Sequence, residues 1–328
     1  MNFFKLLFGG DETPEKEKEE KKNEDNFDTL KYQGIEDYMK RDFTSSIARL
    51  KAALDIHYDH EAMFNLARGY IAIGEYLKAY ETFEAMTQAE PDEAKNYLNM
   101  ARVALGMENY VAMSDACQKA LLIDDKDSTT YLLFAQANHH LGDDITAVAT
   151  LTKSISLDPD NWEAYLLRGQ ILLTMGAAGE AAEDVEYLLS KRPDSEEAMV
   201  LKGQLAMASG NTTEAIEAFD KVIGYNGMNR DAYIGKAQAL IAAGQTDLAI
   251  AVCTEAIDMM DDFAEAYKLR GSLHMQKGNT EAAADDAKRV IELTPELTQQ
   301  LNGEFTSQKP DIEKEMNEKY KSQNPYGF

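Results

Sequence analysis

The chain has 328 residues, of which 58 are acidic and 33 basic, so its formal net charge is −25. This excess of negative charge repels a phosphate backbone and disfavours nucleic acid as the main partner. The length exceeds that of one ordinary core, which favours either two domains or an elongated array.

The chain starts with a short apolar segment, residues 1–10 (MNFFKLLFGG), interrupted by Lys5. It is too short to span a bilayer and lacks the basic leader and the cleavage site of a secretion signal. It is suited to contact with a membrane interface, a partner or this protein itself, and an absence of any role stays open. Residues 11–26 are charged and polar. We therefore expect residues 1–26 to be disordered, with a short apolar hook and a charged tether.

From residue 27 to about residue 297 the sequence repeats with a spacing of 34 residues. One column holds glycine where a first amphipathic helix ends and a second begins, at Gly74, Gly142, Gly176, Gly210, Gly244 and Gly278. A second column, seven residues earlier, holds only small residues and predicts close helix contacts, at Gly34, Ala67, Ala101, Ala135, Gly169, Gly203, Ala237 and Gly271. Proline ends four units, at Pro91, Pro159, Pro193 and Pro295.

Some units depart from this pattern. The first unit is one residue short and lacks the turn glycine, and Glu108 occupies the turn position of the third. Asp125, Gly227 and Asp261 replace the proline of other units. The sequence predicts a loosened turn at these places without loss of the repeat.

A column of larger residues on the second helices predicts a buried core, at Phe83, Cys117, Leu151, Val185, Phe219 and Cys253. The only two cysteines of the chain belong to this column, where a small apolar residue is wanted. They have no partners at metal-binding spacing and indicate no disulfide framework, so we expect no metal and no cofactor. Reducing, cytoplasmic conditions fit best.

These columns, together with the second-helix alanines and the final prolines, resemble the tetratricopeptide repeat family; the alanines are Ala79, Ala147, Ala181, Ala215, Ala249 and Ala283. The resemblance implies an all-α protein, an α-solenoid that forms a right-handed superhelix of about eight helix-turn-helix repeats over residues 27–297. Residues 298–320 are expected to form a C-terminal capping helix region and residues 321–328 a flexible tail. The resemblance also implies a concave groove that binds protein segments.

In this family the groove is lined by one stripe of the first helices, which here would hold Phe64, Arg68, Leu98, Arg102, Leu132, Gln136, Leu166, Gln170, Val200, Gln204, Ile234 and Gln238. The four glutamines form a predicted ladder of amides flanked by apolar residues. Such a ladder suits an extended peptide or an amphipathic helix. The alternative is that the glutamines bond one another or face water, while the apolar residues close the superhelix on itself.

The N-terminal part of the stripe combines cations with amides, at Asn65, Arg68, Lys95, Asn99 and Arg102. This combination suits a carboxylate or an acidic peptide end. It resembles in part the carboxylate clamp of chaperone-binding tetratricopeptide domains, although Ile35 stands where that clamp has Asn and Asn99 stands where it has a basic residue. Ordinary ion pairing with Glu61 and Glu108 is the competing interpretation.

A third column is basic and precedes the small residue, at Arg168, Lys202, Lys236 and Arg270. Asp184 and Asp286 stand opposite the two arginines on the second helices, which predicts ion pairs inside the repeats in place of a ligand site.

The sequence contains no glycine-rich phosphate loop, nucleophile elbow or carboxylate pair, so we do not expect an enzyme. The favoured function is a cytoplasmic scaffold or adaptor that binds a protein or peptide partner in its groove. The alternative is a structural assembly factor recruited to a membrane through residues 1–10. The oligomeric state is left open.

Overall fold

The computed structural model describes residues 14–295, with side chains described from residue 21 onward. Within these residues the chain forms sixteen α-helices and no strand, which confirms the predicted all-α solenoid class. The helices fall into two compact units, Met1–Asp143 and Asp144–Phe328. The predicted capping helix region (298–320) and tail (321–328) lie outside the described residues.

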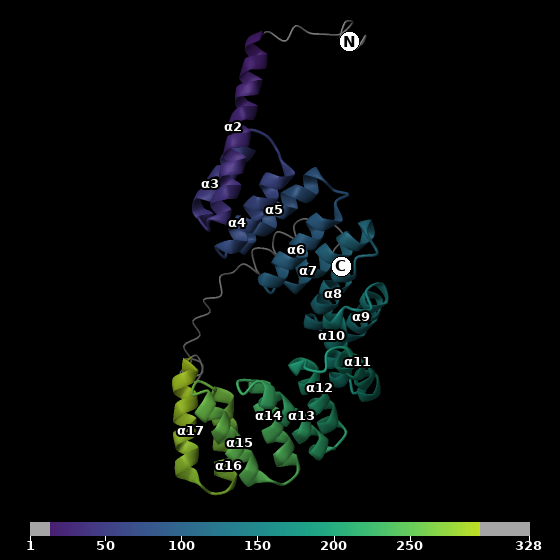
Figure 1. The fold of residues 1–328 in the computed structure, drawn as a ribbon, viewed down its shortest axis with the longest axis vertical. Helices are drawn as coiled ribbons and strands as arrows, with labels where there is room; N and C mark the ends of the chain where they lie inside the picture. Colours follow the sequence, from purple (N-terminus) through teal and green to yellow (C-terminus); the bar gives the residue numbers. More distant parts are fainter. Residues whose placement is uncertain (1–13, 296–328) are drawn as a thin grey trace, which may run out of the picture. The chain divides into compact units, whose positions relative to one another are not determined.

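In the first unit each helix packs against the next along the chain (Figure 1). Its helices are α2 (Pro14–Met39), α3 (Phe43–Leu54), α4 (His60–Ala72), α5 (Tyr76–Ala89), α6 (Ala94–Gly106), α7 (Tyr110–Ile123) and α8 (Ser128–His140). The second unit is built in the same way. Its helices are α9 (Asp144–Leu157), α10 (Trp162–Thr174), α11 (Ala178–Lys191), α12 (Glu196–Ala208), α13 (Thr212–Tyr225), α14 (Arg230–Ala242), α15 (Thr246–Met259), α16 (Ala264–Gln276) and α17 (Thr280–Leu293).

The turn glycines adopt the conformation for which the repeat selects them. All six have positive φ, between 74° and 84°, a region that side chains of L-residues disfavour. The helices that follow inter-repeat turns begin mostly at side chains that accept a hydrogen bond from the first turn, for example Asp59, Asp127 and Asn229. Residues within each repeat therefore determine both its turn and the start of its first helix.

The prediction of loosened turns is wrong at both turn positions that lack glycine. Arg41 and Glu108 adopt positive φ, 63° and 54°, in place of glycine. The reason is the surrounding hydrogen bonding: Asn109 N donates to Ala104 O at 2.9 Å, as Glu75 N donates to Tyr70 O at 2.9 Å in the preceding repeat. These bonds impose the left-handed conformation, although it costs a non-glycine residue about 1–2 kcal/mol.

The inter-repeat turns also keep their form where proline is missing. The amide of Lys126 donates to Asp124 Oδ1 at 3.0 Å, and the amide of Met228 donates to Asn226 Oδ1 at 3.0 Å. A side chain that bonds the backbone two residues later holds such a turn without proline. The loosening predicted at Asp125 and Gly227 is therefore absent.

The predicted core columns are buried. Every member of the large column, from Phe83 to Cys253, is at most 2% exposed. The small column allows close approach, because a Cβ added at Gly203 would lie 2.6 Å from the ring of Phe219. A second glycine approaches the same ring: a Cβ added at Gly235 on α14, which the repeat pattern does not single out, would lie 2.4 Å from it.

The charged tether predicted for residues 11–26 differs from the structure, in which α2 begins at Pro14. Proline is favoured in the first helical turn, and the glutamates and lysines that follow are good helix formers. Phe27 holds the C-terminal part of α2 against the protein: it is 4% exposed, and its ring contacts that of His57 in a tilted arrangement with centroids 3.8 Å apart. Figure 1 shows the upper part of α2 extending beyond α3.

A buried lysine fixes α2 to the start of α4. Lys31 is 7% exposed, and its Nζ lies 2.9 Å from Asp59 Oδ1 and 2.8 Å from Glu61 Oε2. Asp59 also accepts the amide of Ala62 at 2.7 Å. Burial opposes ionisation of Asp59, but the bonds from Lys31 and Ala62 outweigh it and lower the pKa of Asp59.

This junction predicts an acid-sensitive contribution to stability. Because the folded pKa of Asp59 lies below its ordinary value of 3.8, the stabilisation is present above that pH and is lost as the pH falls through the folded pKa. We expect Lys31→Met to reduce the fall in melting temperature between about pH 5 and pH 2, measured by circular dichroism. Lys51→Met, at an exposed residue, is the control; an equal change of slope in both variants would contradict the assignment.

Candidate peptide-binding surfaces

In the first unit, a pocket of about 320 Å³ lies where α4 and α6 begin. It brings together three predicted groove residues, Phe64, Lys95 and Asn99. The remaining lining residues are His60, Glu61, Glu93 and Asn96, which the stripe analysis did not include. They come from the first turns of the same helices, so extending the stripe toward each helix start would have found them.

One wall of this pocket is fixed by a carboxylate. Glu90 Oε2 lies 2.6 Å from His60 Nδ1 and accepts from Asn96 at 3.4 Å, while Glu90 Oε1 accepts from Tyr58 at 3.0 Å. Burial and the bond to Glu90 raise the pKa of Tyr58 to about 12, so its hydroxyl stays protonated at neutral pH. The wall is therefore held by bonds within the protein before any ligand arrives.

Two of the predicted clamp residues are occupied by contacts within the protein. Asn65 is 6% exposed and donates to Glu61 O at 2.8 Å. Arg68 donates to Asn65 Oδ1 at 3.3 Å, and its guanidinium lies 4.4 Å from the ring centroid of Tyr38 on α2. The polar groups of both residues are therefore engaged in contacts within the protein.

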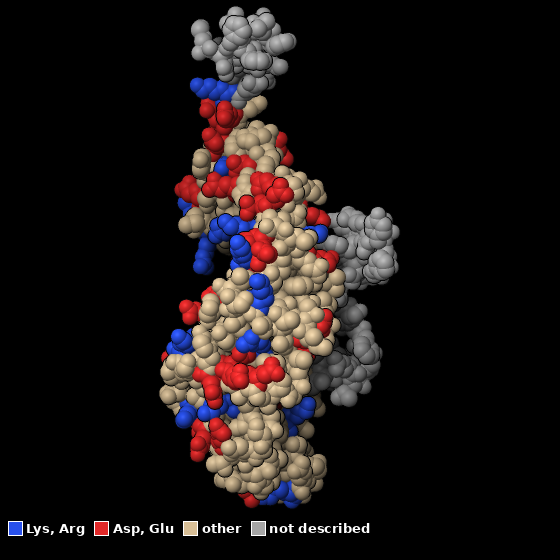
Figure 2. All heavy atoms as spheres, turned by 90° about the vertical axis from the view of Figure 1, so that its right-hand side faces the viewer, with Lys and Arg blue, Asp and Glu red and all other residues tan. Residues whose placement is uncertain are grey.

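The two remaining cations of the predicted clamp, Lys95 and Arg102, are free to contact a ligand. Lys95, Asn99 and Arg102 follow one line along α6, and Lys95 and Arg102 are exposed. Neither has an ion-pair partner within residues 21–295, and Glu61 pairs with Lys31 instead. On the face drawn in Figure 2, acidic side chains are interrupted by Lys and Arg and do not form one continuous patch.

The apolar residues of the stripe in this unit differ in their exposure. Leu132 is only 6% exposed, whereas Phe64 and Leu98 are partly exposed. Gln136 lies on the same helix, α8, and its Oε1 is buried without a hydrogen-bond partner in the described structure. The ligand contacts predicted at Leu132 and Gln136 are therefore less accessible than those on α6.

In the second unit, three glutamines stand at equivalent positions of consecutive repeats. The side chains of Gln170, Gln204 and Gln238 are exposed, and none of these side-chain amides has a hydrogen-bond partner in the described residues. Their helices are neighbours, since α12 contacts both α10 and α14. The amides thus do not bond one another, and their exposure to solvent agrees with the other half of the competing interpretation, in which the glutamines face water.

The apolar residues that flank these glutamines are partly used for packing. Val200 is 9% exposed and belongs to a buried cluster with Phe219 and Val222. Leu166 and Ile234 pack against neighbouring core clusters as partly buried residues. The glutamines of this surface are therefore exposed, whereas its apolar residues are buried or only partly exposed.

The basic column forms ion pairs inside the protein, as predicted. Arg168 donates from Nη2 to Asp184 Oδ1 at 2.6 Å and from Nε to Asp184 Oδ2 at 2.9 Å, and its Nη1 reaches Thr152 at 3.0 Å. Arg270 repeats this geometry with Asp286 and Thr254. Lys236 pairs with Asp220 at 2.6 Å and Lys202 with Glu214 at 3.4 Å.

The chemistry available in the described residues is limited. They contain no group of three or more His, Cys, Asp or Glu side chains placed to hold a metal ion. Burial raises the pKa of Cys117 to about 12 and that of Cys253 to about 11, so neither thiol ionises readily. Among the described helices, none has the length and apolar character needed to cross a membrane.

The hairpins, turn glycines and small-residue contacts define a helical repeat protein of the solenoid class. Models of the tetratricopeptide repeat match residues 128–161, 146–196, 200–262 and 264–297, about half of the chain together. The chain belongs to the tetratricopeptide repeat family, whose repeats generally mediate interactions between proteins. No curated protein sequence matches the chain.

Solved structures show the same fold. A tetratricopeptide repeat protein from Parabacteroides merdae aligns with a TM-score of 0.63 and 21% identity, over 71% of this chain and 92% of that one. The Cut9–Hcn1 hetero-tetramer of the APC/C aligns with a TM-score of 0.56 and 15% identity, over 81% and 53%. PilF from Pseudomonas aeruginosa aligns with a TM-score of 0.54 and 13% identity, over 66% and 99%. At these identities the likeness concerns the fold alone.

Proposed function

We propose that the protein is a non-enzymatic cytoplasmic scaffold that binds an extended peptide segment of a partner along the first-helix stripe. The observation that carries the proposal is the row of exposed amides without partners at Gln170, Gln204 and Gln238. A primary amide donates and accepts at once, as the backbone of an extended peptide requires.

The spacing of the row favours an extended ligand over a helical one. Helices in contact lie roughly 8–10 Å apart, and an extended peptide rises about 3.3 Å per residue. Successive glutamines therefore match about every third residue of the ligand. A helical ligand would need a continuous apolar trough, whereas Val200 is already buried in the protein's own core.

The first unit offers a different contact. In its pocket the partly exposed ring of Phe64 provides an apolar surface, and the partly exposed Asn99 contributes an amide. Lys95 and Arg102, which lack ion-pair partners in the described residues, suit acidic side chains or a carboxylate of the ligand. We therefore expect the pocket of the first unit to prefer an acidic ligand segment.

The expected affinity is modest. One net hydrogen bond of this kind contributes about 0.5–1.5 kcal/mol, and association itself is unfavourable. A few such bonds with one or two apolar contacts give roughly micromolar dissociation constants.

The test is selection of binders from a random peptide library on the full chain, followed by titration of a selected peptide. We expect each of Gln170→Ala, Gln204→Ala and Gln238→Ala to weaken binding about two- to tenfold, the value of one hydrogen bond. Gln88→Ala and Gln276→Ala, at exposed residues outside the row, are the matched controls. Equal affinity in all five variants would remove the amide row from the binding surface.

A further inference from the structure

Each helix that carries a glutamine of the amide row also carries a carboxylate in its first turn. The three carboxylates precede the three glutamines of the row by seven residues each; they belong to Glu163, Glu197 and Asp231. Seven residues are two turns of an α-helix, so each carboxylate lies on the same face of its helix as the glutamine, roughly 10 Å nearer the helix start. A carboxylate row therefore runs beside the amide row in the second unit.

The carboxylate row is accessible to a ligand. Glu163, Glu197 and Asp231 are exposed, and none of them has an ion-pair partner among residues 21–295. Glu197 accepts a hydrogen bond from the hydroxyl of Ser195 at 2.9 Å, which does not neutralise its charge. The helix dipole favours a negative charge in the first turn, but this effect leaves the carboxylates exposed and unpaired.

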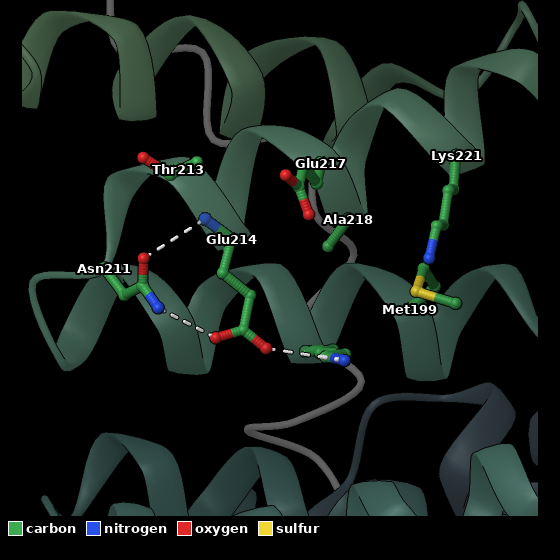
Figure 3. A pocket seen from close by; sticks show the side chains of 8 residues that line it. Met199, Asn211, Thr213, Glu214, Glu217, Ala218 and Lys221 are labelled. Atoms are coloured by element: carbon green, nitrogen blue, oxygen red, sulfur yellow. Dashed lines mark hydrogen bonds and ion pairs between the residues drawn. The ribbon is translucent and has the colours of Figure 1, made fainter.

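The cations of α10, α12 and α14 are all paired with carboxylates elsewhere in the unit. Figure 3 shows one of these carboxylates, that of Glu214, at one end of a cavity of about 330 Å³, where it also accepts a hydrogen bond from Asn211 at 3.0 Å. No cation of the three helices is therefore left to neutralise the carboxylate row. The pairs, at 2.6 to 3.4 Å, are Arg168–Asp184, Lys202–Glu214, Arg230–Asp262 and Lys236–Asp220.

The repeat does not require a carboxylate at this position. Lys95 stands at the equivalent position of α6 and Thr129 at that of α8, and both helices form. The fold therefore accepts a positive, a neutral or a negative residue there, so the three consecutive carboxylates of α10, α12 and α14 are a property of the second unit. Their charge is available to select a ligand.

We propose that the peptide segment bound along the amide row is basic, with Lys or Arg side chains that pair with Glu163, Glu197 and Asp231. The inference rests on the proposed function and adds the charge of the ligand. Because α12 contacts both α10 and α14, and packed helices lie roughly 8–10 Å apart, the row extends over roughly 16–20 Å. An extended peptide covers this distance with about five or six residues, so the ligand carries Lys or Arg at about every second or third position.

The test measures the binding of two fluorescent peptides of equal length to the full chain by fluorescence anisotropy. Both alternate threonine, which favours an extended backbone, with either lysine or glutamine. The double variant Glu163→Gln with Glu197→Gln should weaken the lysine peptide about three- to tenfold, the value of two exposed ion pairs, and leave the glutamine peptide unchanged. The matched control is Glu186→Gln with Glu217→Gln, at exposed glutamates of α11 and α13 that have no ion-pair partner in the described part of the chain. It removes the same charge outside the row and should bind both peptides as the parent does.

A variant of the amide row separates this inference from the proposed function. Gln204→Ala should weaken both peptides, because both use the amides. If it does so while the two double variants bind the lysine peptide equally, the amide row binds without a charge preference and the inference is wrong. If only the variant at Glu163 and Glu197 weakens the lysine peptide, the carboxylate row binds basic segments and the proposed role of the amides is wrong. Absence of saturable binding of the lysine peptide would also overturn the inference.

Discussion

Gly203→Leu should lower the free energy of unfolding of the second unit by about 3 kcal/mol, the upper part of the range for overpacked cores. The ring of Phe219, which is 1% exposed, lies between Gly203 on α12 and Gly235 on α14. A Cβ at either glycine would lie within 2.6 Å of a ring atom. The ring cannot move away from one helix without striking the other, so the helices must separate.

Guanidinium chloride unfolding followed by circular dichroism measures this effect, and hydrogen exchange shows whether protection is lost in α12 to α14. The matched control is Gly179→Ala on α11, where an added Cβ meets no atom within 4 Å. Alanine is a better helix former than glycine, so this variant should be more stable by about 0.5–1 kcal/mol. A lower free energy of unfolding for Gly203→Leu together with a higher one for Gly179→Ala supports the packing argument. A higher free energy of unfolding for Gly203→Leu would refute it.

Asp184→Ala should lower the free energy of unfolding by about 3–5 kcal/mol, the range for a buried ion pair that loses one partner. The side chain of Asp184 is 4% exposed and that of Arg168 is 18% exposed, so the substitution leaves a guanidinium with little access to water. An arginine is not deprotonated in a protein, so Arg168 stays charged after Asp184 is removed and cannot escape this penalty.

Asp220→Ala provides the control in the same unit. Asp220 pairs with Lys236, but its side chain is 49% exposed, so the expected loss is at most about 1 kcal/mol. The double variant Arg168→Met with Asp184→Ala removes both charges and should recover part of the loss. If Asp184→Ala and Asp220→Ala destabilise the protein equally in chemical denaturation, burial is not what makes the first pair important.

The periodic pattern predicted the exposure of some groove residues correctly and that of others incorrectly. Helical spacing placed Gln170, Gln204 and Gln238 on one stripe, and the structure shows them exposed. The same spacing also predicted Leu132 in the first unit and Val200 in the second as groove residues, yet both are buried. A stripe has no sharp edge, because a helical position rotated by about 100° from the core is buried or exposed according to how closely the next helix approaches.

Features confined to one repeat followed from the sequence alone. The positive-φ turns at glycine, the small contact column and the pairs of Arg168 and Arg270 each depend on residues within about one repeat length, so a 34-residue period displays them. The tertiary structure decided what depends on the volume and hydrogen bonding of neighbouring elements. It holds Glu108 in a glycine conformation and orders α2 through Phe27 and Lys31, because both outcomes depend on atoms that the repeat pattern does not bring together.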